Sequence, residues 1–163
     1  CCHQAVEFEE PHDSLARLEN AGIRIAKVQV SSALSLVSPS VERLARFDEP
    51  CYLHQVSVRH PDGTLHRFRD LPEAIAEHGR MLDAEWRCHF HVPIFSPGTA
   101  DFGTTRSFLE RMLPLLPSEP LLEVETYTFD VLPPELRLES VTDSVIREIQ
   151  WLRTQVDAAY RCP

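Results

Sequence analysis

Two pairs of ligand-capable side chains occur at two-residue spacing in this chain. His89 and His91 lie in one predicted strand, and Glu123 and Glu125 lie in another. Side chains alternate along a strand, so each pair shares one face. Burying unpartnered imidazoles or carboxylates in an apolar core is costly. The two strands therefore predict a ligand site on which both pairs converge.

Side chains of this kind at the ends of different strands can hold a divalent ion. His91, Gln29 and Glu125 offer nitrogen and oxygen donors, a mixed set compatible with Mn, Mg, Co or Zn. Such an ion could bridge two oxygens of a sugar or hydroxy-ketone and polarise its carbonyl while a carboxylate moves a proton. Glu125 is then both a metal ligand and the candidate catalytic base. Lys27 either steadies an anionic substrate as a second catalytic residue or pairs with Glu123.

Each candidate has a structural alternative. His89 and His91 fit hydrogen-bonded core histidines as well as they fit a ligand site. Carboxylates are almost never fully buried unless paired or coordinated, which favours a functional Glu125 and leaves Glu123 evenly balanced. His54, in a predicted hairpin region, fits a residue at the surface or the rim of the site.

The elements that must position these residues follow from local signals. Asp-Gly between alternating runs predicts a hairpin, an N-cap with an early proline predicts a helix, and a glycine predicts a helix end. The predicted strands and hairpin are at 23–31, 52–68, 86–95 and 121–128, and the predicted helices follow Pro11 and cover 40–47, 70–79, 104–113 and 140–160.

Strands separated by helices predict βαβ units with a parallel sheet. With the opening segment counted as a strand, about four parallel strands are present, which is half of a (β/α)8 barrel. The expected fold is α/β, the C-terminal half of a TIM barrel, as a single domain over 1–163 with a hairpin insertion at about 51–69. Sites of such barrels lie at the C-terminal strand ends, where Gln29, His91 and Glu125 fall.

Composition excludes several classes of function. The 163 residues are 43% hydrophobic and carry a net charge of −9, from 16 Lys and Arg against 25 Asp and Glu, with no basic run for a nucleic acid backbone. Neither a membrane-spanning stretch nor a signal peptide is predicted. Five cysteines without CxxC spacing favour reduced thiols and a cytoplasmic location. The chain does not begin with Met, which is typical of a fragment.

Five segments together resemble the EboE-type metabolite-traffic proteins, a branch of the xylose-isomerase-like TIM barrels. They run through nearly the whole chain: Cys2-His3-Gln-Ala-Val-Glu7, Lys27-Val-Gln-Val-Ser-Ser-Ala-Leu34, Tyr52-Leu-His-Gln55, His89-Phe-His-Val-Pro-Ile94 and Glu123-Val-Glu-Thr-Tyr-Thr128. The resemblance implies metal ligands at His3, Gln29 and Glu125, beside His91. His89-x-His91 stands where the superfamily's endonucleases have Asp-x-His, a departure that argues against DNA cleavage.

The resemblance also implies a function. We expect a metal-binding metabolite-traffic protein that takes a small polyhydroxylated or carbonyl metabolite, with isomerase or epimerase chemistry and with His54, His89 and Glu123 contacting the substrate. The alternative is a non-catalytic protein that binds and hands over a small-molecule precursor for export. Half a barrel leaves open sheet edges, so we expect the chain to need an N-terminal half or self-association.

Overall fold

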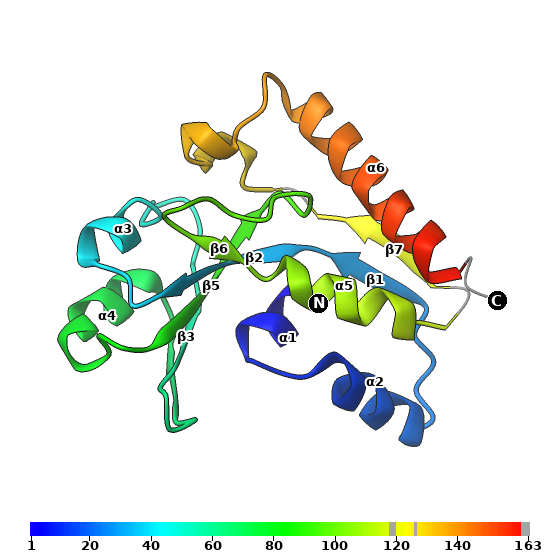
Figure 1. Cartoon of the computed structure of the whole chain (residues 1–163), viewed down its shortest axis with the longest axis horizontal. Helices are drawn as coiled ribbons and strands as arrows, with labels where there is room; N and C mark the ends of the chain where they lie inside the picture. The colour runs from blue at the N-terminus through cyan, green and yellow to red at the C-terminus, as the bar shows by residue number, and fades with distance from the viewer. Residues whose placement is uncertain (118–119, 126, 161–163) are drawn as a thin grey trace.

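The computed structural model describes residues 1–117, 120–125 and 127–160, and within them the strands form two separate sheets (Figure 1). The larger one, here called the antiparallel sheet, has the strand order β4-β3-β5-β2-β6. Its strands are β2 (Ser32–Val37), β3 (Val56–Arg59), β4 (Leu65–Phe68), β5 (Glu85–Val92) and β6 (Gly103–Thr104). The predicted hairpin therefore supplies two strands of this sheet, β3 and β4, which turn at Gly63 with a φ of 87°.

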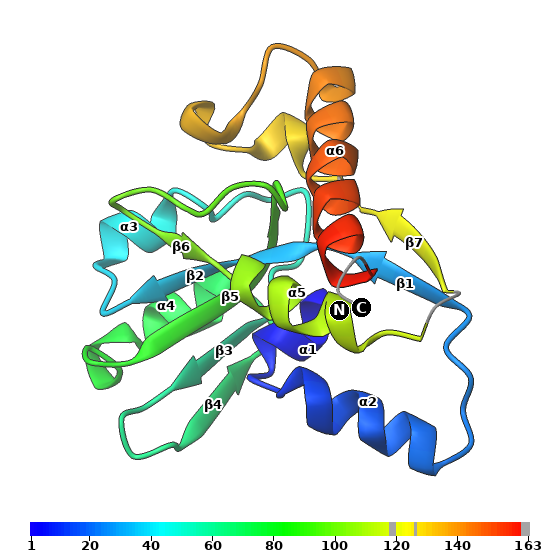
Figure 2. The same cartoon turned by 45° about the vertical axis from the view of Figure 1, so that its right-hand side comes forward.

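The smaller sheet, here called the parallel pair, consists of β1 (Lys27–Val30) and β7 (Leu121–Val124). Gln29 lies opposite Glu123 in its register. Among the described residues, the two strands bond only to each other, so each has an unpaired edge. The chain leaves β1 and enters β2 after a single residue, Ser31, and so passes directly from one sheet to the other (Figure 2).

The expected half of a TIM barrel is wrong, because no barrel closes among the described residues and the larger sheet is antiparallel. The wrong expectation of the fold arises at β2, a strand that no local signal in the sequence predicts. Instead of entering a crossover helix, the chain continues from β1 into β2, and β5 then pairs antiparallel with β2 and β3. The strand that carries His89 and His91 is consequently not part of a parallel sheet.

Helices cover both sheets. They are α1 (Cys2–Val6), α2 (Pro11–Asn20), α3 (Val41–Ala45), α4 (Leu71–Ala76), α5 (Arg106–Met112) and α6 (Val141–Tyr160), with short 3-10 turns at His78–Arg80, Leu113–Leu115, Phe129–Val131 and Pro134–Leu136. The helices predicted after residues 11, 40, 70, 104 and 140 are confirmed. The opening segment, expected as a strand, is instead the helix α1.

Side-chain caps explain where two of these helices begin. The Asp70 carboxylate accepts a hydrogen bond from the Leu71 N–H at the start of α4, and Pro72 follows in the first turn. The Ser140 hydroxyl accepts one from the Asp143 N–H at the start of α6. Both residues satisfy backbone donors that a helix leaves free at its N-terminus.

Two large hydrophobic cores, and a small cluster of Cys2, Val6 and Ala33, hold the elements together. One face of the antiparallel sheet packs under α3 and α4 and contains Trp86, Phe90 and Leu34. The other core lies between the parallel pair, α5 and α6, and contains Val30 and Phe108. Figure 1 shows α6 lying along β7 on this second core.

No helix among the described residues is long and apolar enough to cross a bilayer.

Candidate metal centre

Strand β5 separates polar from apolar side chains by simple alternation. Glu85, Arg87, His89 and His91 share one face, and the residues between them enter the hydrophobic core on the other. A register shift interrupts the pairing with β2 at the histidines, because Ala33 lies opposite His91 whereas Leu34 lies opposite Cys88. Such irregularities re-aim side chains and are common beside functional sites.

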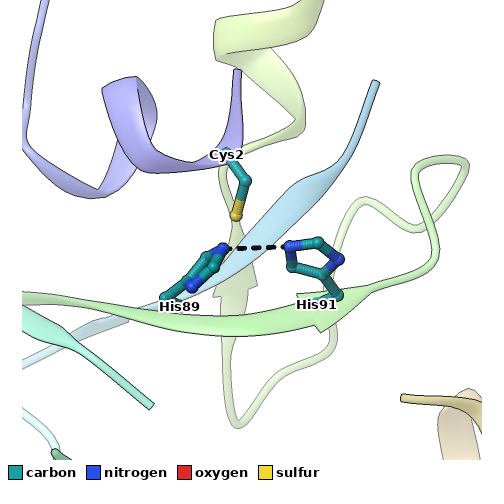
Figure 3. A group of neighbouring side chains, drawn as sticks. All are labelled: Cys2, His89 and His91. Carbon is teal, nitrogen blue, oxygen red and sulfur yellow. Dashed lines mark hydrogen bonds between the residues drawn. The ribbon is translucent and has the colours of Figure 1, made fainter. Parts of the chain in front are cut away.

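Helix α1 lies across this polar face and brings Cys2 to the two histidines. The helix is held by a hydrogen bond from Arg87 Nη1 to the carbonyl of Ala5, 2.7 Å long, and it buries Cys2, Ala5 and Val6. At its other end, the Cys1 thiol donates to the carbonyl of Gln29 over 2.8 Å. In Figure 3 the Cys2 thiol points from α1 toward the gap between the two rings that rise from β5.

The three side chains are close enough to share one ion. One ligand atom from each of Cys2, His89 and His91 lies within 4.8 Å of the others, and the two Nε2 atoms of the histidines are 3.1 Å apart. Two nitrogens of a tetrahedral zinc site, each about 2.05 Å from the ion, lie about 3.3 Å apart. The histidine pair therefore has nearly the spacing of zinc ligands.

Burial keeps both imidazoles neutral, which is the form that binds a metal. It lowers the pKa of His89 to about 4, with further contributions from nearby His3 and His54. Burial likewise lowers the pKa of His91 to about 3, and His89 adds to this. Burial raises the pKa of the Cys2 thiol, and its coordination to a metal would displace the proton.

One buried ring atom in this cluster lacks a partner. Nδ1 of His91 makes no hydrogen bond within the described part of the chain, although the His91 side chain is buried. Buried polar atoms are normally satisfied, and an orphan calls for an explanation. The donor set of one sulfur and two imidazoles fits a metal site, whereas an ion bound at Nε2 would still leave this Nδ1 in need of an acceptor of its own.

Neighbouring side chains fix the backbone that carries the histidines. The buried ring of His54 lies with Nδ1 3.2 Å from the carbonyl of His89 and with Nε2 2.7 Å from Glu49 Oε1. His54 thus links the backbone of His89 to the side chain of Glu49 through its two ring nitrogens. Thr128 donates to the carbonyl of His91 over 2.6 Å, and the Tyr127 ring centroid lies 4.4 Å from that of His91.

The predicted site residues divide into two groups, of which the first surrounds this cluster. His89 and His91 belong to it, and the exposed ring of His3 lies with its centroid 4.0 Å from that of His89. Glu125 follows β7 and donates its N–H to the carbonyl of Val30, and its charge raises the pKa of the Cys2 thiol, an effect smaller than that of burial.

The second group lies on the outer face of the parallel pair. Lys27 Nζ is 2.5 Å from Glu123 Oε2, and both side chains are about half exposed. Gln29 is also exposed on this face, and its backbone carbonyl rather than its amide meets the cluster, through Cys1. The structure thus pairs Lys27 with Glu123, which was the simpler of the two readings of Lys27.

Sequence reasoning missed Cys2 and misplaced His54. The expected position of His54 at the surface or rim is wrong, since its side chain is 1% exposed. The one available signal for Cys2 was its place directly before His3 in the first matched segment. Cys88 faces away from His89, as alternation along a strand requires, and lies in the apolar core.

Comparison with known proteins does not assign the chain to a family. No protein-family model, no curated protein and no solved structure matches the chain.

Proposed function

We propose that this protein holds a divalent metal ion at Cys2, His89 and His91. The observation that carries the proposal is the convergence of one thiol and two neutral imidazoles, within 4.8 Å, from a helix and a strand that are far apart in the sequence. The two Nε2 atoms face each other at 3.1 Å, and an ion placed beside them and the Cys2 thiol would take both nitrogens and the sulfur as ligands.

The donor set narrows the choice of ion. A cysteine sulfur is a soft ligand, whereas Mg²⁺ prefers oxygen and Mn²⁺ suits carboxylates. Sulfur with two imidazoles matches Zn²⁺ or Co²⁺, and three protein ligands with one open position is the arrangement of catalytic zinc. Of the four ions expected from the sequence, we therefore favour Zn²⁺ and Co²⁺.

The proposed substrate is a small polyhydroxylated or carbonyl metabolite. A bound divalent ion would supply Lewis acidity to an oxygen of such a molecule. Glu125, whose charge acts on Cys2, is the proposed proton-transfer group, and the Tyr127 ring beside His91 offers an apolar wall for a sugar face. Lys27 is already paired with Glu123, so a role for it in proton transfer requires that this exposed ion pair opens.

A role in metabolite traffic, as in the EboE-type proteins, is supported only by the resemblance of the five sequence segments named above. In that reading the protein would bind and hand over its metabolite without changing it. Cys1, Cys2, Cys51 and Cys88 are all free thiols, which suits a reducing compartment such as the cytoplasm.

A second candidate is a closed, structural zinc site that fastens α1 to β5. The proximity of His3 to His89 favours it, because His3 could supply a fourth ligand and leave no open position. In a Co²⁺-loaded sample, His3→Ala would change the ligand-field spectrum if His3 binds the ion. An unchanged spectrum would favour the open, catalytic arrangement.

Metal content by elemental analysis tests the proposal. We expect about one Zn²⁺ or Co²⁺ per chain, lost in Cys2→Ser and His91→Ala. Cys51→Ser and His12→Ala are the matched controls, because Cys51 is exposed and the His12 side chain is 79% exposed. Absence of metal from the wild type after incubation with either ion, or equal loss in the controls, would contradict the proposal.

Proton exchange separates an enzyme from a handover protein. An isomerase or epimerase would incorporate solvent deuterium into a bound sugar, and Glu125→Gln would stop the incorporation while leaving the metal in place. Binding without any incorporation across a panel of sugars would favour the handover protein.

A further inference from the structure

A small polar cavity lies on the face of the antiparallel sheet that also carries the two histidines, beside α5. Its volume is about 220 Å³, below the roughly 300–1,000 Å³ typical of sites for larger organic ligands. Arg87 on β5 and Arg111 on α5 reach it from two elements, and hydroxyl side chains line much of the rest. Figure 2 shows α5 lying next to β2, β5 and β6, where these residues originate.

The cavity holds more positive charge than its carboxylate neutralises. Arg87 Nε lies 2.9 Å from Glu85 Oε1, but Glu85 also pairs with Arg59 over 2.7 Å. One carboxylate therefore serves two guanidinium groups. Within the part of the chain that the structure describes, the one ion pair of Arg111 is a long contact of 3.7 Å to Glu10, and its side chain is half exposed.

The Arg87 guanidinium is fixed in place before any ligand arrives. Nη1 donates to the carbonyl of Ala5, and the group lies 4.0 Å from the centroid of the Phe8 ring. Nη2 donates to no atom among the described residues. Arg111 reaches the same cavity from α5, so an anion between the two guanidinium groups would contact both of them.

Hydroxyl groups in the cavity have protons to donate. The buried Thr105 Oγ1 accepts from the N–H of Ala33 over 2.8 Å, which leaves its own proton free. Ser35 and Ser107 make no side-chain hydrogen bond within residues 1–117, 120–125 and 127–160. Thr104 differs, because its hydroxyl already donates to the carbonyl of Ser96. Donors from several directions around a small volume suit an anion with several oxygens.

We propose that this cavity binds a phosphate or sulfate group, free or as the end of a small metabolite. Guanidinium and hydroxyl donors match the oxygens of such a group, and Arg is the side chain best suited to phosphate. The cavity has its own lining, which includes neither Cys2 nor His89 nor His91, although Arg87 and His89 are neighbours on the same face of β5, about 7 Å apart along the strand. It does not rest on the metal proposal.

Titration of metal-free protein with inorganic phosphate at constant ionic strength, followed by calorimetry and by amide NMR shifts, tests the site. We expect saturable binding with shifts at Thr105 and Ser107. Arg111→Gln should weaken binding about tenfold, the usual scale for losing one charge-assisted hydrogen bond. Ser107→Ala, also on an exposed residue of α5, should weaken it by about threefold.

Arg80→Gln is the matched control. Arg80 lies in the turn after α4 on the opposite face of the sheet, its side chain is 84% exposed, and its loss changes the net charge equally. The proposal would be overturned if Arg80→Gln weakened phosphate binding as much as Arg111→Gln does. Binding that does not saturate would also overturn it. Methyl phosphate and acetate extend the test: methyl phosphate should bind as phosphate does if the natural ligand is a phosphorylated metabolite, and equally tight acetate binding would contradict a tetrahedral anion.

Discussion

The two faces of the antiparallel sheet are built from the same strands and differ in almost every other respect. On one face Trp86, Cys88 and Phe90 are buried among apolar neighbours under α3 and α4. On the other face Arg87, His89 and His91 lie under the short helix α1. Successive side chains of β5 thus point in turn into the apolar core and onto the polar face.

The contrast shows which face can tolerate change. The apolar face has no polar function to lose, and its stability comes from burial. The polar face contributes less burial and depends on partners for each group, so its substitutions should alter binding more than folding. Neighbouring residues on β5 therefore offer matched tests.

The largest expected effect is on the apolar face. Trp86 is fully buried, and its indole N–H donates to the carbonyl of Met81 over 3.2 Å. Trp86→Ala should lower the free energy of unfolding by about 3–5 kcal/mol in urea denaturation. Ser57→Ala, a buried position of the polar face whose hydroxyl donates to Glu7, should cost only about 1 kcal/mol. Similar losses for the two would erase the distinction between the faces.

Metal addition should stabilise through the polar face alone. Zn²⁺ at about 100 times its Kd should raise the free energy of unfolding by about 2.7 kcal/mol, measured by thermal or urea unfolding. His91→Ala should abolish this gain. Phe90→Leu should lower the stability of the metal-free protein but leave the gain on adding Zn²⁺ unchanged. A gain that survives in His91→Ala would count against the metal centre.

A smaller effect is expected at the residue that links the two faces. His54 packs against Phe90, with ring centroids 4.9 Å apart, yet it contacts the backbone of His89. His54→Leu leaves the Glu49 carboxylate without this partner and should cost about 2 kcal/mol of stability. The double variant with Glu49→Gln should recover part of the loss. Additive losses in the double-mutant cycle would show that the two residues do not interact.

The smallest effect is a dependence on pH. Burial alone would raise the pKa of Glu85, but its pairing with Arg87 and Arg59 lowers the net value below the ordinary 4.5. A lowered folded-state pKa means that Glu85 stabilises the protein above about pH 4.5 and loses this contribution as the pH falls through its folded value. Glu85→Gln should flatten the stability profile in this range by up to about 1 kcal/mol. An identical profile in wild type and variant would show that the pairing adds nothing to stability.

Local signals in the sequence predicted the helices and the hairpin. Asp70 with Pro72, and Ser140 with Asp143, act within one turn, so they need no knowledge of the fold. The pairing of the strands does need it. β2, Ser-Ala-Leu-Ser-Leu-Val, has four buried residues in its first five and shows weak alternation, so no strand was predicted between residue 31 and the helix that begins at residue 40. That omission, together with an opening segment counted as a strand although it is the helix α1, led to the expectation of a barrel in place of an antiparallel sheet.

The same distinction between local signals and contacts across the fold applies to the candidate site. The shared face of His89 and His91 follows from alternation within one strand. The contribution of Cys2 depends on where α1 packs against β5. The burial of His54 depends on its hydrogen bonds with the side chains of Glu49 and Asp70. Contacts of this kind arise only once the chain has folded.

The position of Cys2 on α1 has a consequence for the order of the first residues. A helix of five residues does not persist on its own, so α1 stays in place only while it is docked. An ion shared by Cys2 and His89 would join α1 directly to β5 in the folded protein. The metal would then be a reversible cross-link of the native state, with a chelator as the agent that releases the helix.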